Sequence, residues 1–544
     1  MDLKLITDKY VRSEEALRKF MEEISKVDKD ILKICRDLII SKEPEKLDPD
    51  DVENPHYDLY DTSYYDLGKE KFSCFAFITL AGGSATRFFS ELGSKASLKS
   101  KAVFPFTENV NFLDLFAGEI LASSITSGYL SPWLIMVSDN TADEIIEYVK
   151  NPPFGFPKDY IFVVKQGVLP RFDDQGLPIV LKDGSMIWTG NGHGGVFFLL
   201  KEDAKETLLN QALDVRNIKQ YLNDIGVEHA VIHNVDNVFS KPTDFSRLGF
   251  HIYKNSLFTI SAVERKDINE KIGLIVYLPK QSRYHAIEYS FADPRIFRRL
   301  KNGQPYYNVG HINTNIFSLD IIEDRYIRSI RPVLYSGKII EICGEKISTN
   351  TVEFLNHMMI NVLPPDRVNI LIVKRDEFFL PTKTISKEDS IQKSREKYFS
   401  HISEKMKRLG VNIPDVSTFE LAPYLVFGDF DIFDTRGWEI QNQTKFYFGA
   451  FFSQDKYCIS EGFKLINGAE LFINSSKPFG NMVVKDRKIL GFQNPPKVKI
   501  GKNVCIRARV KINLEEGSEL IIRDGTEIKR DIFTNVRKFQ NFVI

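Results

Sequence analysis

A short apolar run ends in two glycines, and an arginine and a lysine follow it. The stretch LAGGSATRF places Gly82 and Gly83 directly after the run and Arg87 just beyond, and Lys101 opens the stretch KAVFP. Paired glycines let a backbone turn sharply and point amide N–H groups into a cavity with no side chain in the way. Such groups bind phosphate, and guanidinium and ammonium groups add positive charge. The stretch predicts a phosphate-binding loop, although a structural turn explains the loop taken alone equally well.

Two later segments have the same character. NGHGGVFF crowds Gly192 and His193 into a loop where a ligand can approach the backbone, and IHNVDNVF places Asp236 at the end of an apolar strand. A carboxylate in that position commonly holds a metal that carries nucleotide phosphates. The alternatives are a turn-forming aspartate, a structural histidine and a solvated Lys101. The glycine loop matches neither G-x-G-x-x-G nor G-x-x-x-x-G-K-[ST], so it indicates neither a dinucleotide fold nor a P-loop ATPase.

The composition is that of an ordinary globular protein. The 544 residues include 73 basic and 73 acidic side chains, so no net field favours nucleic acid or an anionic membrane. Five scattered cysteines without a C-x-x-C spacing argue for a reducing compartment and against a disulfide framework or a zinc site. The sequence has no signal-peptide core and no apolar run of about 20 residues. We therefore expect a cytoplasmic protein without a nucleic-acid or membrane partner.

Residues from about 72 to 375 alternate short apolar runs with helical patterns. SCFAFITL, PWLIMVS, YIFVVK, HAVIHNV and LFTISAVE are typical of strands, and TADEIIEYVK and residues 205–224 are typical of helices. This alternation predicts an α/β fold with a central, mainly parallel or mixed sheet flanked by helices. Ligands of such sheets bind beyond the carboxyl ends of the strands, where the loops gather.

The two ends of the chain differ from this central part. An apolar stripe from Leu17 to Leu38 predicts a helix that packs against the chain itself, with a coiled coil as the alternative. Residues 498–512 place apolar pairs two apart that repeat six apart, which suggests the stacked coils of a β-helix. The open end of such a stack exposes backbone edges, which favours a homo-oligomer joined through this region. The expected domains are an N-terminal helical segment (1–71), an α/β domain (72–418) and a C-terminal β-rich domain (419–544).

As a set, these segments resemble the UDP-sugar pyrophosphorylases, which join UTP to a sugar 1-phosphate. LAGGSATRF is similar to the family's L-x-G-G-x-G-T-R-[LM] loop, and KAVFP to its K-x-x-[LVI]-P lysine. KQGVLP, VDNVF, AIEYS and YNVGHI are similar to blocks of the N-acetylglucosamine branch, and KRDEFFLPTK to its R-x-x-E-F-S-P-L-K. GHGGV and the C-terminal repeat are closer to the UDP-glucose and broad UDP-sugar branches. The blocks follow the family's order from about residue 72 to residue 383.

The resemblance implies a glycosyltransferase-A-like core that makes a UDP-sugar and pyrophosphate, with Mg²⁺ as cofactor. N-acetylglucosamine 1-phosphate is slightly favoured over glucose 1-phosphate or a broad hexose range. The reaction would be a direct displacement at the α-phosphorus of UTP. The implied positions are Gly82 and Gly83 at the UTP backbone contact, Arg87, Lys101 and Lys383 at the phosphates, Gln166, Gly192 and His193 at the nucleotide, Asp236 at the magnesium ion, and Gly273, Glu288, Asn308 and Gly310 at the sugar.

The chain departs from the family pattern at the loop. Ala85 replaces a glycine where the backbone must approach phosphate, and Phe88-Phe89 replaces a Leu-Gly or Met-Gly pair. Lys99 is the alternative to Lys101 as the key lysine, although the spacing to the following proline favours Lys101. These departures leave open a catalytically silent protein that binds UTP or a UDP-sugar. A metal-dependent sugar-nucleotide glycosyltransferase is a further alternative, although such enzymes usually show D-x-D where this chain has NVDN.

Overall fold

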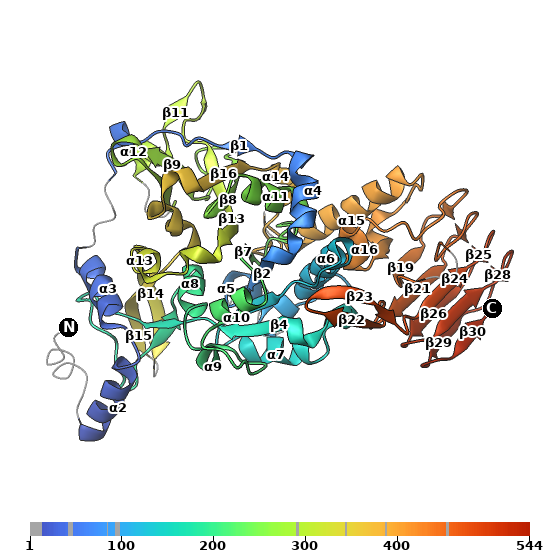
Figure 1. The fold of residues 1–544 in the computed structure, drawn as a ribbon, viewed down its shortest axis with the longest axis horizontal. Coiled ribbons are helices and arrows are strands. Elements are labelled where there is room, and N and C mark those ends of the chain that lie inside the picture. Colours follow the sequence, from blue (N-terminus) through green and yellow to red (C-terminus); the bar gives the residue numbers. More distant parts are fainter. Residues whose placement is uncertain are drawn as a thin grey trace.

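The structure is a computed structural model that describes residues 13–41, 47–83, 85–92, 98–289, 293–342, 345–386, 389–452 and 456–544. Residues 1–12 and 42–46 of the predicted N-terminal segment therefore lie outside the described residues. The N-terminal helices lie at one end of the elongated molecule and the C-terminal strands at the other (Figure 1). Within the described ranges, every helix is too short or too polar to cross a bilayer.

A mixed ten-stranded sheet lies at the centre of the molecule (Figure 1). Its strands, in the order in which they pair, are β1 (Asp58–Leu59), β16 (Val368–Ile372), β8 (Phe258–Glu264), β13 (Val309–Ser318), β7 (His229–Asn234), β2 (Phe75–Leu80), β3 (Trp133–Val137) and β4 (Ile161–Lys165); off this path, β9 (Leu274–Leu278) pairs with β13, and β10 (Arg283–Ile287) pairs with β9. β7, β2, β3 and β4 are parallel neighbours, whereas β13 is antiparallel to β7 and β8. The predicted mixed sheet flanked by helices is thus confirmed.

The sheet is buried on both faces, as continuous apolar strands predict. All six residues of β2 are buried, and its successive side chains point to opposite faces. On one face, Phe77 shares a core with α6 (Phe112–Ser127). On the other face, Ile78 shares a second core with α3 (Lys29–Ser41) and α10 (Ile218–Asp224). Helices therefore cover both faces and leave the carboxyl ends of the strands for the loops.

The N-terminal apolar stripe lies on two helices instead of one. α2 (Glu14–Ile24) ends before residues 25–28, and α3 resumes the pattern at a new angle (Figure 1). Phe20 and Cys35 are fully buried in the same core as the sheet. The prediction that this segment packs against the chain itself is therefore supported, and the prediction of one continuous helix is wrong.

The predicted helix over residues 205–224 is wrong in its middle. The structure has α9 (Ala204–Thr207) and α10 there, with non-helical chain between them. Leu209 donates its N–H to the Val163 carbonyl, and the Asn210 side chain accepts the N–H of Val163 at 2.9 Å. Among the described strands, β4 pairs with β3 alone, so the backbone groups along its other edge need partners. Hydrogen bonds from this segment to those groups outweigh its helical pattern.

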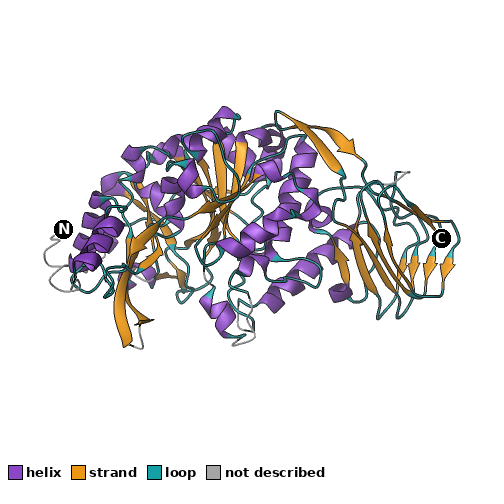
Figure 2. Cartoon of the chain, turned by 90° about the horizontal axis from the view of Figure 1, so that it is seen from below, coloured by secondary structure: helices purple, strands orange, loops and turns teal. Residues whose placement is uncertain are grey.

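Most of the C-terminal region is a stack of parallel strands (Figure 2), and β22 (Asn481–Lys485) and β23 (Lys488–Gln493) form a separate antiparallel hairpin. The repeat predicted from the sequence is present, because its apolar pairs, Val498, Ile500, Val504, Ile506, Val510 and Ile512, are all fully buried inside the stack. Every ladder of the stack is parallel within the described residues. The three sheets are β17 (Phe419–Leu421), β19 (Lys445–Gly449), β21 (Glu470–Ser475), β26 (Arg509–Leu514) and β29 (Ile532–Val536); β18 (Glu439–Ile440), β20 (Lys464–Leu465), β25 (Cys505–Ile506) and β28 (Glu527–Ile528); and β24 (Lys497–Ile500), β27 (Glu519–Ile522) and β30 (Asn541–Val543).

The stack shares a hydrophobic core with the central part of the molecule. α16 (Pro423–Phe427) packs on α6, where a methyl group on Gly118 would lie 2.5 Å from the side chain of the first residue of α16. Further along, Arg487 donates to the Ser73 carbonyl at 2.6 Å. The C-terminal region is therefore held firmly against the sheet, and the predicted domain boundary at residue 419 stays a prediction.

Glu119 on α6 is a buried carboxyl group whose ionisation opposes folding. Burial raises its pKa to about 7, although the N–H and hydroxyl of Thr243 donate to its Oε1 at 3.0 and 2.8 Å. Because the folded chain then binds this proton more tightly than the unfolded chain, the stabilisation is present at low pH and is lost as the pH rises from about 4.5 to about 7. We expect Glu119→Gln, which keeps the acceptor oxygen, to raise the free energy of unfolding at pH 8 by roughly 2–3 kcal/mol and to leave it nearly unchanged at pH 4. Urea titrations at both pH values measure this difference, and equal stability of the two proteins at pH 8 would contradict the argument.

Candidate functional site

A cavity of about 550 Å³ lies beyond the carboxyl ends of β2, β3, β4 and β7. These four strands are parallel neighbours, so the segments that follow them meet at one edge of the sheet. The cavity therefore lies where the strand pattern predicts a ligand site. Seven of the predicted site residues line it, namely Gly82, Gly83, Lys101, Gln166, Gly192, His193 and Asp236.

The glycine loop after β2 leads into a short helix, α5 (Thr86–Ser90). Its N-cap residue, Ala85, has a left-handed conformation with φ 46° and ψ 37°, which costs an L-residue about 1–2 kcal/mol. A glycine would adopt this conformation without strain, which explains the glycine of the family pattern. Phe88 is buried behind the loop, with its ring centroid 5.7 Å from the Lys101 ammonium. Of the two residues that differ from the family pattern, Phe88 thus packs in the core, whereas Ala85 strains the backbone.

Gln166 follows β4, and its amide group is wedged between two glycines. A Cβ atom on Gly82 would lie 2.7 Å from Gln166 Oε1, and a Cβ atom on Gly190 would lie 2.3 Å from Gln166 Nε2. Side chains at these glycines would push the amide out of position. The two glycines therefore hold a planar donor and acceptor at the cavity wall, which suits hydrogen bonding to the edge of a base.

Lys101 and Asp236 form an ion pair inside the cavity. Lys101 Nζ lies 3.7 Å from Asp236 Oδ2 and donates to the Thr382 carbonyl at 2.7 Å. Lys101 is only 7% exposed, and burial lowers the pKa of its ammonium group, although the Asp236 carboxylate opposes that shift. A buried cation of this kind is stabilised by anions that enter the cavity, such as phosphate.

Lys101, and not Lys99, lines the cavity; the Lys99 residue is exposed. Arg87 and Lys383 do not line it, but both lie close enough for their charges to lower the pKa of Lys101 further. Lys383 is held near the site because the preceding residue donates its N–H to the Asp236 carbonyl at 2.8 Å. The structure therefore brings these cationic side chains together around one carboxylate.

Asp236 fits a hard cation that is shared with a bound phosphate group. Its side chain is 22% exposed at the cavity, so one carboxylate remains accessible beside the lysine. Mg²⁺ in nucleotide sites is commonly held by one or two carboxylates, substrate phosphates and water. The residues present therefore suit Mg²⁺ that arrives with a nucleotide.

Gly192 and His193 enter the cavity from the loop after β6 (Trp188–Gly190). Gly192 has φ 86°, and a Cβ atom there would lie 2.3 Å from the Phe354 carbonyl oxygen, so this position requires glycine. His193 Nδ1 accepts the N–H of Asn356 at 3.0 Å, and burial lowers the pKa of His193 to about 3. His193 is thus a neutral side chain that both supports the loop and lines the cavity.

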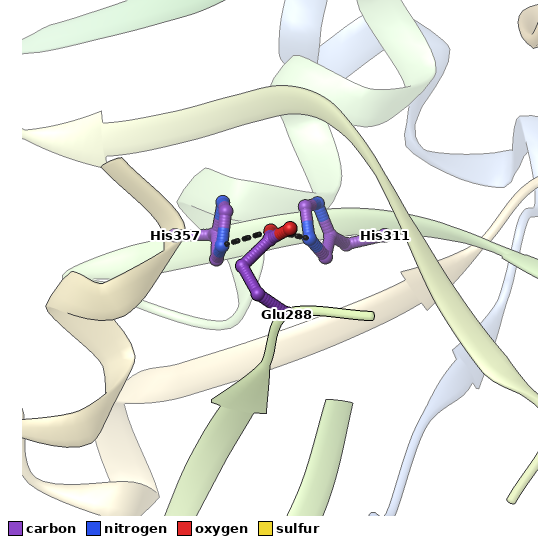
Figure 3. A group of neighbouring side chains, drawn as sticks. All are labelled: Glu288, His311 and His357. Carbon is purple, nitrogen blue, oxygen red and sulfur yellow. Dashed lines mark ion pairs between the residues drawn. The ribbon is translucent and has the colours of Figure 1, made fainter. Parts of the chain in front are cut away.

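The four predicted sugar residues, Gly273, Glu288, Asn308 and Gly310, do not line this cavity. Gly310 lies on β13, where a Cβ atom would lie 2.8 Å from the Ile272 side chain. Glu288 directly follows β10, and its carboxylate lies beside the imidazole rings of His311 and His357, whose centroids are 3.8 Å apart (Figure 3). Glu288, His311 and His357 therefore form a polar group outside the cavity, and Gly273 borders it.

His357 connects this polar group to the cavity. Its ring centroid lies 5.6 Å from that of the cavity-lining His193. Burial lowers the pKa of His357 to about 4, so its imidazole is neutral at pH 7. Burial alone would raise the pKa of Glu288, but the two imidazoles beside it lower that pKa below its usual value, so the carboxyl group is ionised.

Three charged residues of the lining were missed in the sequence, namely Arg171, Lys338 and Glu353. Arg171 directly follows the KQGVLP block, so that block could have pointed to it. Lys338 and Glu353 come from the hairpin of β14 (Val333–Ile342) and β15 (Glu345–Glu353) and pair at 3.7 Å, and no motif marks them. With these residues, cationic side chains outnumber carboxylates in the lining, which suits a polyphosphate.

Several known proteins are similar in sequence to this chain. Residues 30–429 match the family described as UTP–glucose-1-phosphate uridylyltransferase. A protein from Schizosaccharomyces pombe, described as a "Probable UDP-N-acetylglucosamine pyrophosphorylase", is 28% identical over 311 residues, which are 53% of this chain and 60% of that protein. A UDP-N-acetylglucosamine pyrophosphorylase from Saccharomyces cerevisiae is 30% identical over 195 residues, 35% of this chain and 38% of that protein. The chain thus matches less than two thirds of the length of either relative.

Solved structures share the fold. The uridine diphosphate N-acetylglucosamine pyrophosphorylase from Trypanosoma brucei has a TM-score of 0.62 at 19% identity, over 76% of this chain and 88% of that chain. The UDP-glucose phosphorylase from Trypanosoma brucei has a TM-score of 0.54 at 13% identity, over 98% of this chain and 100% of that chain. At such identities, likeness of structure indicates a common fold alone. The sequence match, however, spans most of the chain, and the chain belongs to the UTP–glucose-1-phosphate uridylyltransferase family.

Proposed function

We propose that this protein is a uridylyltransferase that makes a UDP-sugar and pyrophosphate from UTP and a sugar 1-phosphate. The observation that carries the proposal is the Lys101–Asp236 pair in a cavity beyond four parallel strands, directly beside the glycine loop. Family membership supports the same reaction class. The names of the sequence relatives favour N-acetylglucosamine 1-phosphate as the sugar substrate, with glucose 1-phosphate or a broad hexose range as the alternative.

The proposed reaction is an in-line displacement. An oxygen of the sugar 1-phosphate attacks the α-phosphorus of UTP, the new P–O bond forms, and the bond to pyrophosphate breaks. The nucleophile is already an anion at neutral pH, so the protein needs no general base. Its task is to hold two mutually repelling polyanions in line, which requires positioning and neutralisation of charge.

The residues of the cavity divide this task among them. Gly82 and Gly83 would offer backbone N–H groups to UTP, and Gln166, with Gly192 and His193, would face uracil. Lys101 would neutralise phosphate charge from its buried position. Asp236 would hold Mg²⁺, which when bound supplies positive charge to the phosphates. The remaining predicted positions are Arg87 and Lys383 at the phosphates and Gly273, Asn308, Gly310 and Glu288 on the sugar side.

Three finer structural assignments accompany this function. We assign the sheet to the glycosyltransferase-A-like type and the C-terminal stack to a short β-helix, on the basis of their strand order. We also propose a homo-oligomer formed through the end of the stack. There β29 and β30 each pair along one edge, and Phe533 and Phe539 are exposed.

Replacement of Ala85 by glycine tests the strained loop. We expect Ala85→Gly to raise the affinity for Mg²⁺·UTP by roughly three- to tenfold, because the methyl group that lines the cavity no longer stands where phosphate approaches the loop backbone. Isothermal titration calorimetry on both proteins measures the change. Ala102→Gly is the matched control, since Ala102 also lines the cavity but has no left-handed backbone, and it should give no gain. An Ala85→Gly protein with unchanged affinity would show that the loop is not at the phosphates.

Pyrophosphate release tests the function as a whole. The full chain is incubated with UTP and Mg²⁺ and, in parallel, with glucose 1-phosphate, galactose 1-phosphate or N-acetylglucosamine 1-phosphate. We expect release that depends on both UTP and a sugar phosphate, fastest with N-acetylglucosamine 1-phosphate. Silence with all three sugars from a folded protein that binds UTP tightly would overturn the proposal in favour of a binding protein.

A further inference from the structure

Three potential metal ligands converge behind the nucleotide cavity (Figure 3). Glu288 follows β10, His311 lies on β13, and His357 belongs to the 3₁₀ helix η11 (Asn356–Asn361). The Nε2 atoms of His311 and His357 lie 3.5 and 3.1 Å from Glu288 Oε1, and one ligand atom from each residue lies within 4.8 Å of the others. Segments that are distant in sequence therefore bring three potential donor atoms close together.

The two imidazoles are buried without ordinary hydrogen-bond partners. His311 is 9% exposed and His357 is 1% exposed. None of their four ring nitrogens has a hydrogen-bond partner among the described residues. Buried polar atoms are nearly always satisfied, so each exception calls for an explanation such as an ion or a water molecule. Four exceptions on two adjacent rings, both beside one carboxylate, point to a shared ligand.

A glycine stands directly beside this group. A Cβ atom on Gly273 would lie 2.4 Å from His311 Nε2 and 3.2 Å from Glu288 Oε1. A side chain at this position would therefore displace the donor atoms of His311 and Glu288. The spacing of the donors also suits a small cation, because ligands bound at about 2.0–2.2 Å in a tetrahedron lie a little more than 3 Å apart.

We propose that Glu288, His311 and His357 bind a late first-row divalent cation of the Zn²⁺ class. Two imidazoles and one carboxylate are a ligand set that zinc takes in proteins, with a fourth position left for water or a substrate oxygen. Mg²⁺ prefers oxygen ligands, so the site differs in kind from the one proposed at Asp236. The scattered cysteines argued against a zinc site, but the ligands here are histidines. This inference goes beyond the proposed function, and it keeps Glu288 on the sugar side as a metal ligand instead of a direct sugar contact.

Zinc binding to the full chain tests the proposal without any nucleotide. Protein treated with a chelator and dialysed is titrated with Zn²⁺ in competition with a chromophoric chelator, and with Co²⁺ while its visible absorption is recorded. We expect one site per chain and a Co²⁺ spectrum of four- or five-coordinate metal with nitrogen ligands. We also expect Zn²⁺ to raise the Tm of the wild-type protein, because a ligand that binds the folded state stabilises it.

Variants identify the ligands. His311→Ala, His357→Ala and Glu288→Gln should each weaken Zn²⁺ binding by roughly 100-fold or more and abolish the Co²⁺ spectrum. His401→Ala is the matched control, since His401 is another partly buried histidine but lies outside the group, and it should bind as the wild type does. Gly273→Ala, which leaves all three ligands in place, should weaken binding by crowding His311. Circular dichroism of each variant shows whether it is folded.

Two results would overturn the inference. The first is a folded wild-type protein that binds no Zn²⁺ in the micromolar range, which would mean that the two histidines merely hold the Glu288 carboxylate. The second is equal loss of binding in the ligand variants and in His401→Ala. Neither readout uses UTP, so failure of the pyrophosphate assay leaves this test intact, and absence of zinc leaves the uridylyltransferase proposal intact.

Discussion

Asp236→Asn is expected to abolish the response of pyrophosphate release to Mg²⁺ and to lower kcat/KM by roughly 1,000-fold at saturating metal. The amide has nearly the shape of the carboxylate but no charge, so it holds a cation of a metal–nucleotide complex far less well. The change also removes the anion beside Lys101, 3.7 Å away, and leaves that ammonium group buried without its partner. Initial rates over a Mg²⁺ titration measure the effect.

Asp139→Asn is the control for this variant. Asp139 also follows a strand of the same sheet edge, β3, but its carboxylate is exposed and pairs with Lys165. We expect this protein to keep its rate and its dependence on Mg²⁺. If Asp236→Asn showed the wild-type dependence on metal, Asp236 would not be the metal ligand.

Lys101→Met should lower kcat/KM by roughly 100- to 1,000-fold while leaving the fold at least as stable as that of the wild type. Methionine keeps the length and the apolar stem, and the ring of Phe88 remains available for packing. Lys101 is 7% exposed, and burying the charge of its ammonium group opposes folding. Removal of this charge is therefore expected to keep or raise the free energy of unfolding. Steady-state kinetics and urea unfolding of the same preparation separate the two effects.

The pH dependence of the wild type supplies a second readout for this lysine. Burial lowers the pKa of Lys101 below the ordinary lysine value, so its charge, and the activity that needs it, is lost as the pH rises through that lowered value. We expect the alkaline limb of kcat/KM to disappear in Lys101→Met. Lys99→Met, on the exposed neighbour, should keep both the rate and the limb. Wild-type turnover in Lys101→Met would show that Lys101 does not take part in the reaction.

Much of the fold was predictable because strands that are buried on both faces appear in the sequence as continuous apolar runs. The strands β2, β3, β4, β7 and β8 coincide with the apolar runs from which they were predicted. The segment 205–224 was not predictable, because its middle is held by hydrogen bonds to the edge strand β4. A local helical pattern carries no information about such a distant partner.

The candidate site was likewise predictable from the sequence only in part. Gly82, Gly83 and Lys101 were found because they lie in one stretch of chain, and Asp236 because it ends a strand. Lys338 was missed, because a hairpin far along the chain carries it to the cavity. The left-handed backbone of Ala85 was likewise visible only in three dimensions, although the sequence had marked the position as a departure.

By itself, the sequence determined the class of sheet, the edge of the sheet at which the cavity lies and the residue types of the loop, because these follow from patterns within single segments. Only the tertiary structure decided between Lys99 and Lys101, seated Gln166 between two glycines, and brought Glu288, His311 and His357 to one point. The physical reason is that burial and close contact between separate segments depend on how strands and loops pack. The spacing of residues along the sequence does not predict that packing.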